Sequence, residues 1–162
     1  MPMKALLASA LGGLVLLAAV PAGAMDPAPL PAFEVKSLDG RSVASSALGS
    51  TGQWLLLYVT PRSRPSTLLM GLIKQDQADA SGRIVVVVGG SLAEAKAACA
   101  ATPGLARAGW YADPEHSAFD ALAIDGAPTA MGLRERVMQW KMQGVLADGH
   151  TVKSILLTWL AE

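Results

Sequence analysis

The sequence predicts one α/β domain, a mixed sheet flanked by helices, and three observations favour this class. Two apolar runs of strand length, Trp54–Val59 and Ile84–Val88, have the continuous hydrophobicity of strands that are buried on both faces. Between them, residues 66–79 carry leucines and isoleucine at helical spacing. Strand-like and helical segments then alternate to the end of the chain. The 162 residues are enough for one domain with a substantial core.

Residues 1–24 have the layout of a secretory signal peptide. Lys4 is a lone charge, Ala5–Val20 is a continuous run of apolar and small residues, and Ala22-Gly23-Ala24 is a cleavage site of the A-x-A type. The run is short of the ~20 residues that a spanning helix needs. We therefore expect cleavage near Ala24 and a periplasmic or otherwise exported protein. The alternative is that the segment stays in place as an N-terminal anchor.

The mature chain opens with a Pro-rich leader, residues 25–31, and the domain proper follows as residues 32–162. We expect the leader to be extended, because proline fixes φ and has no N–H to donate. Phe33–Ser37 alternates polar and apolar residues, a Leu-Asp-Gly-Arg turn follows, and Ser42-Val43 returns. This pattern predicts a small β-hairpin.

The second half supplies the remaining elements. Ser91–Ala101 is a predicted helix with Ser91 as its N-cap, because serine oxygen accepts from a free N–H of the first turn. The other predicted elements are a strand at Gly109–Asp113, a helix at Pro114–Ala123, two tightly joined strands at Pro128–Leu133 and Val137–Met142, and an amphipathic helix at Thr151–Leu160.

Composition and charge exclude several classes of function. The chain has 13 basic and 13 acidic side chains, with no basic stripe to bind nucleic acid. Its single cysteine, Cys99, excludes an internal disulfide framework. No ligand spacing suggests zinc or an iron–sulfur cluster, no glycine-rich loop suggests a phosphate site, and we predict no cofactor. We also predict no membrane-spanning segment in the mature chain.

Three motifs, in this order, carry a resemblance to a known family. They are the hairpin over Phe33–Val43, the apolar strand and turn over Trp54–Ser66, and the segment Phe119–Thr129 with its Gly-Ala-Pro-Thr end. Over about Pro31–Leu160 the chain resembles the thioredoxin-like superfamily, in particular exported thiol-disulfide oxidoreductases of the TlpA/ResA type. The resemblance implies a thioredoxin-like mixed sheet with an N-terminal hairpin extension.

The resemblance also implies where the redox motif lies and what replaces it. Ser63-Arg64-Pro65-Ser66 stands where these enzymes carry Cys-x-x-Cys, and Pro128 stands where they carry a cis-proline that packs against that motif. A thiolate at a helix N-terminus attacks a disulfide, and the second thiol resolves the intermediate. Serine hydroxyls are far less acidic and form no disulfide. We therefore predict that this turn has no dithiol activity. The absence of a dithiol site also favours a protein that is not an enzyme.

The serines have another interpretation. Ser63 is predicted to be the N-cap of the following helix, with Pro65 in its first turn. A nucleophilic serine would need an adjacent base, and the two histidines, His116 and His150, lie in stretches that predict surface positions. Arg62 and Arg64 flank Ser63 and, with Ala127 and Pro128, form a possible contact for an acidic partner segment. The alternative is that both arginines are merely solvated.

The sulfur atoms of Cys99 and of three methionines suggest two further functions, thiol chemistry and copper binding. Cys99 lies on an alanine-rich helix, and we expect a buried, inert thiol, although a lone cysteine in an exported protein could also bridge to a partner. Met131, Met138 and Met142 fall on the two late strands, and thioethers are ligands for Cu(I). Alternation predicts that Met138 and Met142 share a face, but core packing is the simpler role.

The sequence thus favours an exported, redox-inactive thioredoxin-like domain that binds a protein partner in the periplasm or cell envelope. Two alternatives stay open. The first is a protein related to thiol-disulfide oxidoreductases that acts through Cys99 or a partner's thiol. The second is a periplasmic copper-handling protein that uses the methionines.

Overall fold

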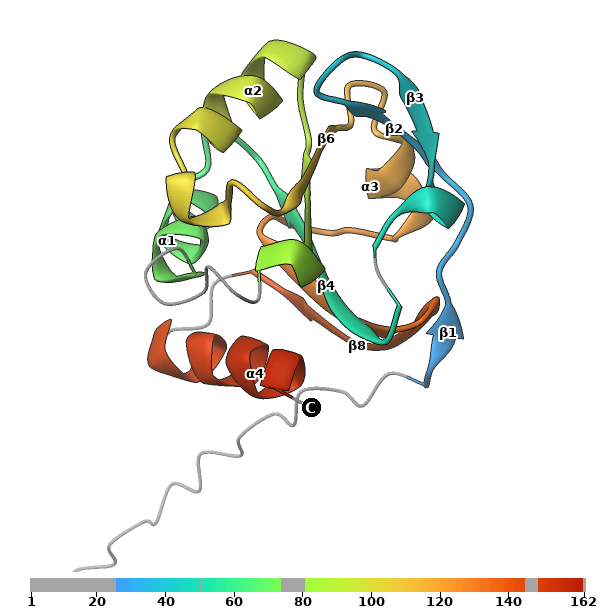
Figure 1. The fold of residues 1–162 in the computed structure, drawn as a ribbon, viewed down its shortest axis with the longest axis vertical. Helices are drawn as coiled ribbons and strands as arrows, with labels where there is room; N and C mark the ends of the chain where they lie inside the picture. The colour runs from blue at the N-terminus through green and yellow to red at the C-terminus, as the bar shows by residue number, and fades with distance from the viewer. Residues whose placement is uncertain (1–25, 50, 74–80, 145–148, 162) are drawn as a thin grey trace, which may run out of the picture.

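A computed structural model of the protein describes residues 26–49, 51–73, 81–144 and 149–161, and shows one mixed sheet between helices (Figure 1). The strands lie in the order β1-β8-β7-β4-β5-β6-β2-β3. They are β1 (Ala28–Pro29), β2 (Glu34–Ser37), β3 (Ser42–Ala44), β4 (Gln53–Val59), β5 (Ile84–Val88), β6 (Gly109–Ala112), β7 (Thr129–Arg134) and β8 (Val137–Gln143). The helices are α1 (Arg64–Ile73), α2 (Leu92–Ala100), α3 (Ser117–Ala121) and α4 (Gly149–Ala161). The predicted α/β class is confirmed.

The two continuous apolar runs form the parallel centre of the sheet. Every residue of β4 and of β5 is buried, and Leu55 lies beside Ile84 in the ladder. β6 is parallel to β5 on one side, and β7 is antiparallel to β4 on the other. The carboxyl ends of β4, β5 and β6 therefore meet at one edge of the sheet, the edge at which ligands of open α/β sheets are usually bound.

Neighbouring side chains of β4 enter two different hydrophobic cores, because successive residues of a strand point to opposite faces. Leu55 and Leu57 belong to a core that also contains residues of α1, α2 and α4. Trp54, Leu56 and Tyr58 belong to a second core, which α3 and the N-terminal strands complete. The sheet is thus the middle of three layers (Figure 1).

The helices begin where their local sequences dictate. Ser91 is the N-cap of α2, and it forms a capping box in which its Oγ accepts from the Glu94 N–H while the Glu94 carboxylate accepts from the Ser91 N–H. This confirms the predicted cap. α3 is shorter than the predicted 114–123, because His116 has a φ of 59° and interrupts helical geometry just before Ser117. The predicted 66–79 helix is formed as far as Ile73, and residues 74–80 lie outside the described part.

The predicted N-terminal hairpin is present, with Val35 opposite Val43. Gly40 in its turn has a φ of 87°, which glycine adopts without strain. Within the Pro-rich leader, Ala28 and Pro29 pair with Met138 and Val137 at the edge of the sheet. The predicted signal peptide lies outside the described residues.

No helix within the described ranges has the length and apolar character needed to cross a membrane.

A register shift between β7 and β8 decides where the late side chains point. Gly132 pairs with Trp140, whereas the next residue, Leu133, pairs with Met138, so β8 accommodates one extra residue. Met138 therefore packs in the core beside α3, while Met142 packs against the opposite core. The prediction that these two methionines share a face was wrong, because strict alternation holds only along an unbroken ladder.

Candidate functional site

The segment that joins β4 to α1, together with the first residues of that helix, spans residues 60–66 and is called the serine turn here. Ser63 is its last residue before the helix. The Ser63 Oγ accepts a hydrogen bond from the backbone N–H of Ser66 at 3.4 Å, and the Ser63 carbonyl accepts from the N–H of Thr67 at 3.1 Å. This is the arrangement of an N-cap residue, and Pro65 in the first turn loses no intrahelical bond. Ser63 thus caps the N-terminus of α1, whose first residue is Arg64.

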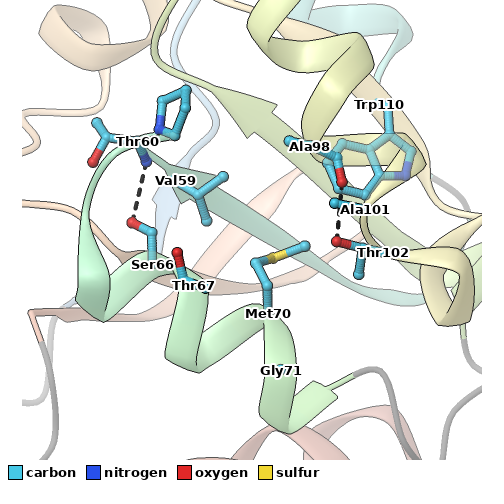
Figure 2. Close-up of a pocket in the computed structure, with 11 residues that line it drawn as sticks. Val59, Thr60, Ser66, Thr67, Met70, Gly71, Ala98, Ala101, Thr102 and Trp110 are labelled. Carbon is cyan, nitrogen blue, oxygen red and sulfur yellow. Dashed lines mark hydrogen bonds between the residues drawn. The ribbon is translucent and has the colours of Figure 1, made fainter.

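Ser66 has a different structural task. Its side chain is buried, and its Oγ accepts a hydrogen bond from the backbone N–H of Thr60 at 3.1 Å (Figure 2). The bond fastens the first turn of α1 to the end of β4. Both serine oxygens are therefore acceptors for backbone N–H groups, and this use is structural.

The two arginines of the serine turn face solvent. The Arg62 side chain is 93% exposed, and its Nη2 lies 3.9 Å from Glu94 Oε1, at the long limit of an ion pair. Such exposed pairs contribute little, because water screens both charges. Arg64 is exposed at the first position of α1. Within the described part of the chain, no close ion pair holds either guanidinium, and an exposed guanidinium can bind a carboxylate of another molecule.

Ala127 and Pro128 lie next to the serine turn, although more than 60 residues separate them from it in the sequence. Thr129 pairs with Tyr58, so continuing this antiparallel register places Pro128 and Ala127 beside the end of β4. The Ala127–Pro128 peptide bond is cis, Pro128 is buried, and Ala127 is half-buried. The structure therefore brings together the residues that the sequence singled out around Ser63 and Pro128.

Two cavities open on either side of Thr60. The first, of about 180 Å³, lies between α1 and α2, and Figure 2 shows Met70 and Trp110 in its walls together with small and hydroxylated side chains. The second, of about 490 Å³, lies on the side of α3. It is lined by Tyr58, Thr60, Glu115, His116, Phe119 and Asp120. The second cavity was not anticipated from the sequence.

Tyr58 and Asp113 form a buried pair behind this second cavity. The Tyr58 hydroxyl donates to Asp113 Oδ2 at 3.2 Å, and the same oxygen accepts from the Phe119 N–H at 3.0 Å. Burial, together with the nearby Asp113 carboxylate, holds the pKa of Tyr58 well above its usual range. Asp113 Oδ1 has no hydrogen-bond partner among the described residues. The sequence did contain one indication of this site. Asp113 lies at the end of a predicted strand, and polar residues at the carboxyl ends of parallel strands meet at the edge of the sheet where ligands usually bind.

Cys99 and the histidines lie outside this arrangement. Cys99 is half-buried on α2, packs against the core beneath α1 and α2, and its pKa is raised by burial. His116 is exposed at the start of α3, and the side chain of His150 is not among those described. Ser63 has no histidine among its described hydrogen-bond partners. In the described residues, no three His, Cys, Asp or Glu side chains are grouped closely enough to hold a metal ion.

The serine turn exposes cationic groups beside the start of a helix. It offers two exposed guanidinium groups and the start of a helix, which favour a carboxylate. It offers no thiol, and its two hydroxyls already accept backbone hydrogen bonds. Beyond Thr60, the α3 cavity has carboxylates in its walls, so the two sides of this edge differ in charge.

No family model and no curated protein matches the sequence. Solved structures do match the fold. A Chlorobium tepidum protein named as a thiol:disulfide interchange protein, DsbE, matches with a TM-score of 0.65 at 18% identity, over 85% of this chain and 99% of that one. A secreted Mycobacterium tuberculosis disulfide oxidoreductase matches with a TM-score of 0.62 at 11% identity, over 78% and 95%.

A third match is the exposed lipoprotein thioredoxin Etrx1 of Streptococcus pneumoniae, with a TM-score of 0.58 at 14% identity, over 78% of this chain and 98% of that one. These likenesses show that the chain has the thioredoxin-like fold. Function depends on the residues of the site and not on the fold.

Proposed function

We propose that this chain is an exported, redox-inactive thioredoxin-like domain that binds a protein partner in the cell envelope. The binding face consists of Arg62, Ser63, Arg64, Ala127 and Pro128. By the resemblance to thiol-disulfide oxidoreductases, Ser63 and Ser66 occupy the two positions at which those enzymes have their redox cysteines. One observation carries the proposal: both serine hydroxyls accept backbone hydrogen bonds that hold the start of α1 in position. The conformation of the turn is thus stabilised by residues that have no thiol.

The proposed partner segment is an extended chain with an acidic residue. An extended chain gains affinity from backbone hydrogen bonds, and its side chains supply specificity. Arg62 and Arg64 are exposed beside the start of α1, and a planar guanidinium binds a carboxylate with two parallel hydrogen bonds. The proposed signal peptide, residues 1–24, places such a partner in the periplasm or envelope.

Thiol chemistry through Cys99 is the second candidate, and its surroundings disfavour it. Reactive cysteines have a lowered pKa and an accessible sulfur atom. Cys99 is half-buried, and burial raises its pKa. Copper binding by the three methionines is disfavoured for a geometric reason. Met131 and Met138 pack in one core and Met142 against the other, so the sheet separates them.

Site-specific photo-crosslinking in the intact envelope tests the binding face. A benzophenone amino acid replaces Arg64 in one variant and Thr158, an exposed residue of α4, in a matched control. We expect irradiation to produce a discrete adduct from position 64 and none from position 158. We also expect Arg62→Ala to reduce the yield at position 64. Equal adducts from both positions would place the partner elsewhere, and no adduct at either would contradict the binding proposal.

A further inference from the structure

The cavity between Thr60 and α3 has an unusual combination of walls. The exposed ring of His116 and the half-buried ring of Phe119 line it together with the carboxylate-bearing Glu115 and Asp120, and the fully buried ring of Tyr58 also lies in its wall. Among the described residues that line it there is no lysine or arginine. At about 490 Å³ the cavity is large enough for a long side chain.

The rings pack on one another and make an ordered wall. The Phe119 ring centroid lies 5.8 Å from that of Tyr58 and 5.9 Å from that of His116, with tilted and edge-on geometries. The Phe119 side chain is half-buried, while Glu115 and Asp120 are exposed on either side of it in the sequence. An apolar wall with carboxylates at its rim suits a side chain with an apolar stem and a cationic end.

A further acidic group lies behind the rings. The carboxyl group of Asp113 is fully buried against the Tyr58 hydroxyl, and its Oδ1 has no described partner. Both Asp113 and Asp120 contribute to the raised pKa of Tyr58. Asp113 and Glu115 also line a neighbouring cavity of about 180 Å³. The Lys36 side chain lines that neighbouring cavity, where its Nζ donates to Ser42 Oγ, and it does not line the larger one.

We propose that the cavity lined by Tyr58, Glu115, His116, Phe119 and Asp120 receives an arginine side chain of the partner protein. The inference rests on the proposed function and makes the partner segment more specific. A guanidinium stacks on an aromatic face and also binds carboxylates, so it uses both kinds of wall, whereas a lysine ammonium is a compact, strongly hydrated charge.

The charge pattern across the edge of the sheet agrees with this occupant. Arg64 begins α1, and Arg62 lies 3.9 Å from Glu94 of α2, whereas Glu115 and Asp120 line the cavity beside α3. α1 and α2 pack on one core and α3 on the other, so the two arginines and these two carboxylates belong to opposite sides of the sheet. A partner chain that crosses this edge is complementary when it places an acidic residue beside the arginines and an arginine in the α3 cavity. Opposite charges at the two ends also fix the direction in which the chain is bound.

The first test uses short probe peptides and amide chemical shifts of the mature protein. The probe is acetyl-Gly-Gly-Arg-Gly-Gly-amide, and its matched control carries citrulline, which has the shape of arginine without its charge. We expect the arginine peptide to shift the amide resonances of Ser117–Ala121 in a saturable way. The citrulline peptide should bind about tenfold more weakly, because charged hydrogen bonds and cation–π contacts are lost.

Variants of the protein then locate the effect. Glu115→Gln and Asp120→Asn should each weaken the arginine peptide about three- to tenfold, and Asp26→Asn, an equal charge change near the N-terminus, should leave its affinity unchanged. Equal binding of the arginine and citrulline peptides, or equal affinity in all three variants, would overturn the inference. So would shifts confined to residues outside α3 and the end of β4.

The two proposals fail in distinguishable ways. Cross-linking from position 64 without arginine-dependent shifts at α3 would retain the binding face and remove the arginine site. Arginine-dependent shifts without any envelope adduct would retain the site and remove the proposed function.

Discussion

The buried hydroxyl of Ser66 accepts a hydrogen bond from the backbone N–H of Thr60 at 3.1 Å, and this bond joins the first turn of α1 to the residue after β4. The Thr60 N–H would otherwise be left without this partner in a half-buried position. Leaving such a group unsatisfied costs about 1–3 kcal/mol. Ser66 is thus part of the framework that sets the shape of the serine turn.

We expect Ser66→Ala to lower the free energy of unfolding by about 1–3 kcal/mol, because the Thr60 N–H loses its acceptor. Urea denaturation followed by circular dichroism measures the change. Ser46→Ala serves as the control, since Ser46 is exposed and should change stability by less than about 0.5 kcal/mol. An equal effect of both substitutions would show that the Ser66 bond contributes nothing specific.

We expect the double variant Ser63→Cys, Ser66→Cys to form a reversible disulfide between the two introduced thiols. The resemblance places both positions at a redox motif, and residues three apart share one face of a helix. Mass spectrometry after alkylation, with and without reductant, counts the free thiols. The wild-type protein should not reduce insulin disulfides in the same assay series. A double variant that folds but does not oxidise would contradict the alignment of this turn with a dithiol site.

Cys99 should react slowly with iodoacetamide at neutral pH. Its ordinary thiol pKa of 9.0 is raised by burial in the fold, so less thiolate is present at a given pH than in the unfolded chain. The alkylation rate of the native protein should therefore still be rising with pH above about 9, whereas the rate in denaturant should level off earlier. A native thiol that reacts faster than the denatured one would favour the thiol-based alternative.

Substituting alanine at two glycines, Gly132 and Gly71, should change the stability of the protein in opposite directions. A Cβ at Gly132 would overlap the indole of Trp140, whereas a Cβ at Gly71, inside α1, would meet nothing. We expect Gly132→Ala to destabilise the protein by about 1–3 kcal/mol through this overlap. Gly71→Ala should stabilise it by about 0.5–1 kcal/mol, because alanine is the better helix former. Thermal unfolding of both variants measures the difference, and a neutral Gly132→Ala would contradict the packing of Trp140 against β7.

The sequence predicted those parts of the fold that local patterns determine. The apolar runs over Trp54–Val59 and Ile84–Val88 became the buried centre of the sheet, and Ser91 became a helix cap. Each of these depends only on burial or on neighbouring residues. The short pairing of Ala28 and Pro29 with β8 was not foreseen, since two residues have no detectable periodicity.

The errors arose where distant segments decide the outcome. The face of Met138 depends on a register shift opposite Gly132, which no pattern within β8 reveals. The α3 cavity depends on contacts such as Tyr58 to Asp113, which lie 55 residues apart. Residues around Ser63 were recognised as a candidate site because a motif marks them, whereas Glu115 and Asp120 belong to no motif.

The two serines give the turn between β4 and α1 a single covalent state. A dithiol at this place would exist in reduced and oxidised forms, and the surrounding redox potential would set their ratio. Ser63 and Ser66 hold the same helix start with hydroxyl groups that neither oxidants nor reductants interconvert. The shape of this turn therefore does not change with the redox potential of the compartment. A ligand bound across it would keep the same affinity under oxidising and reducing conditions.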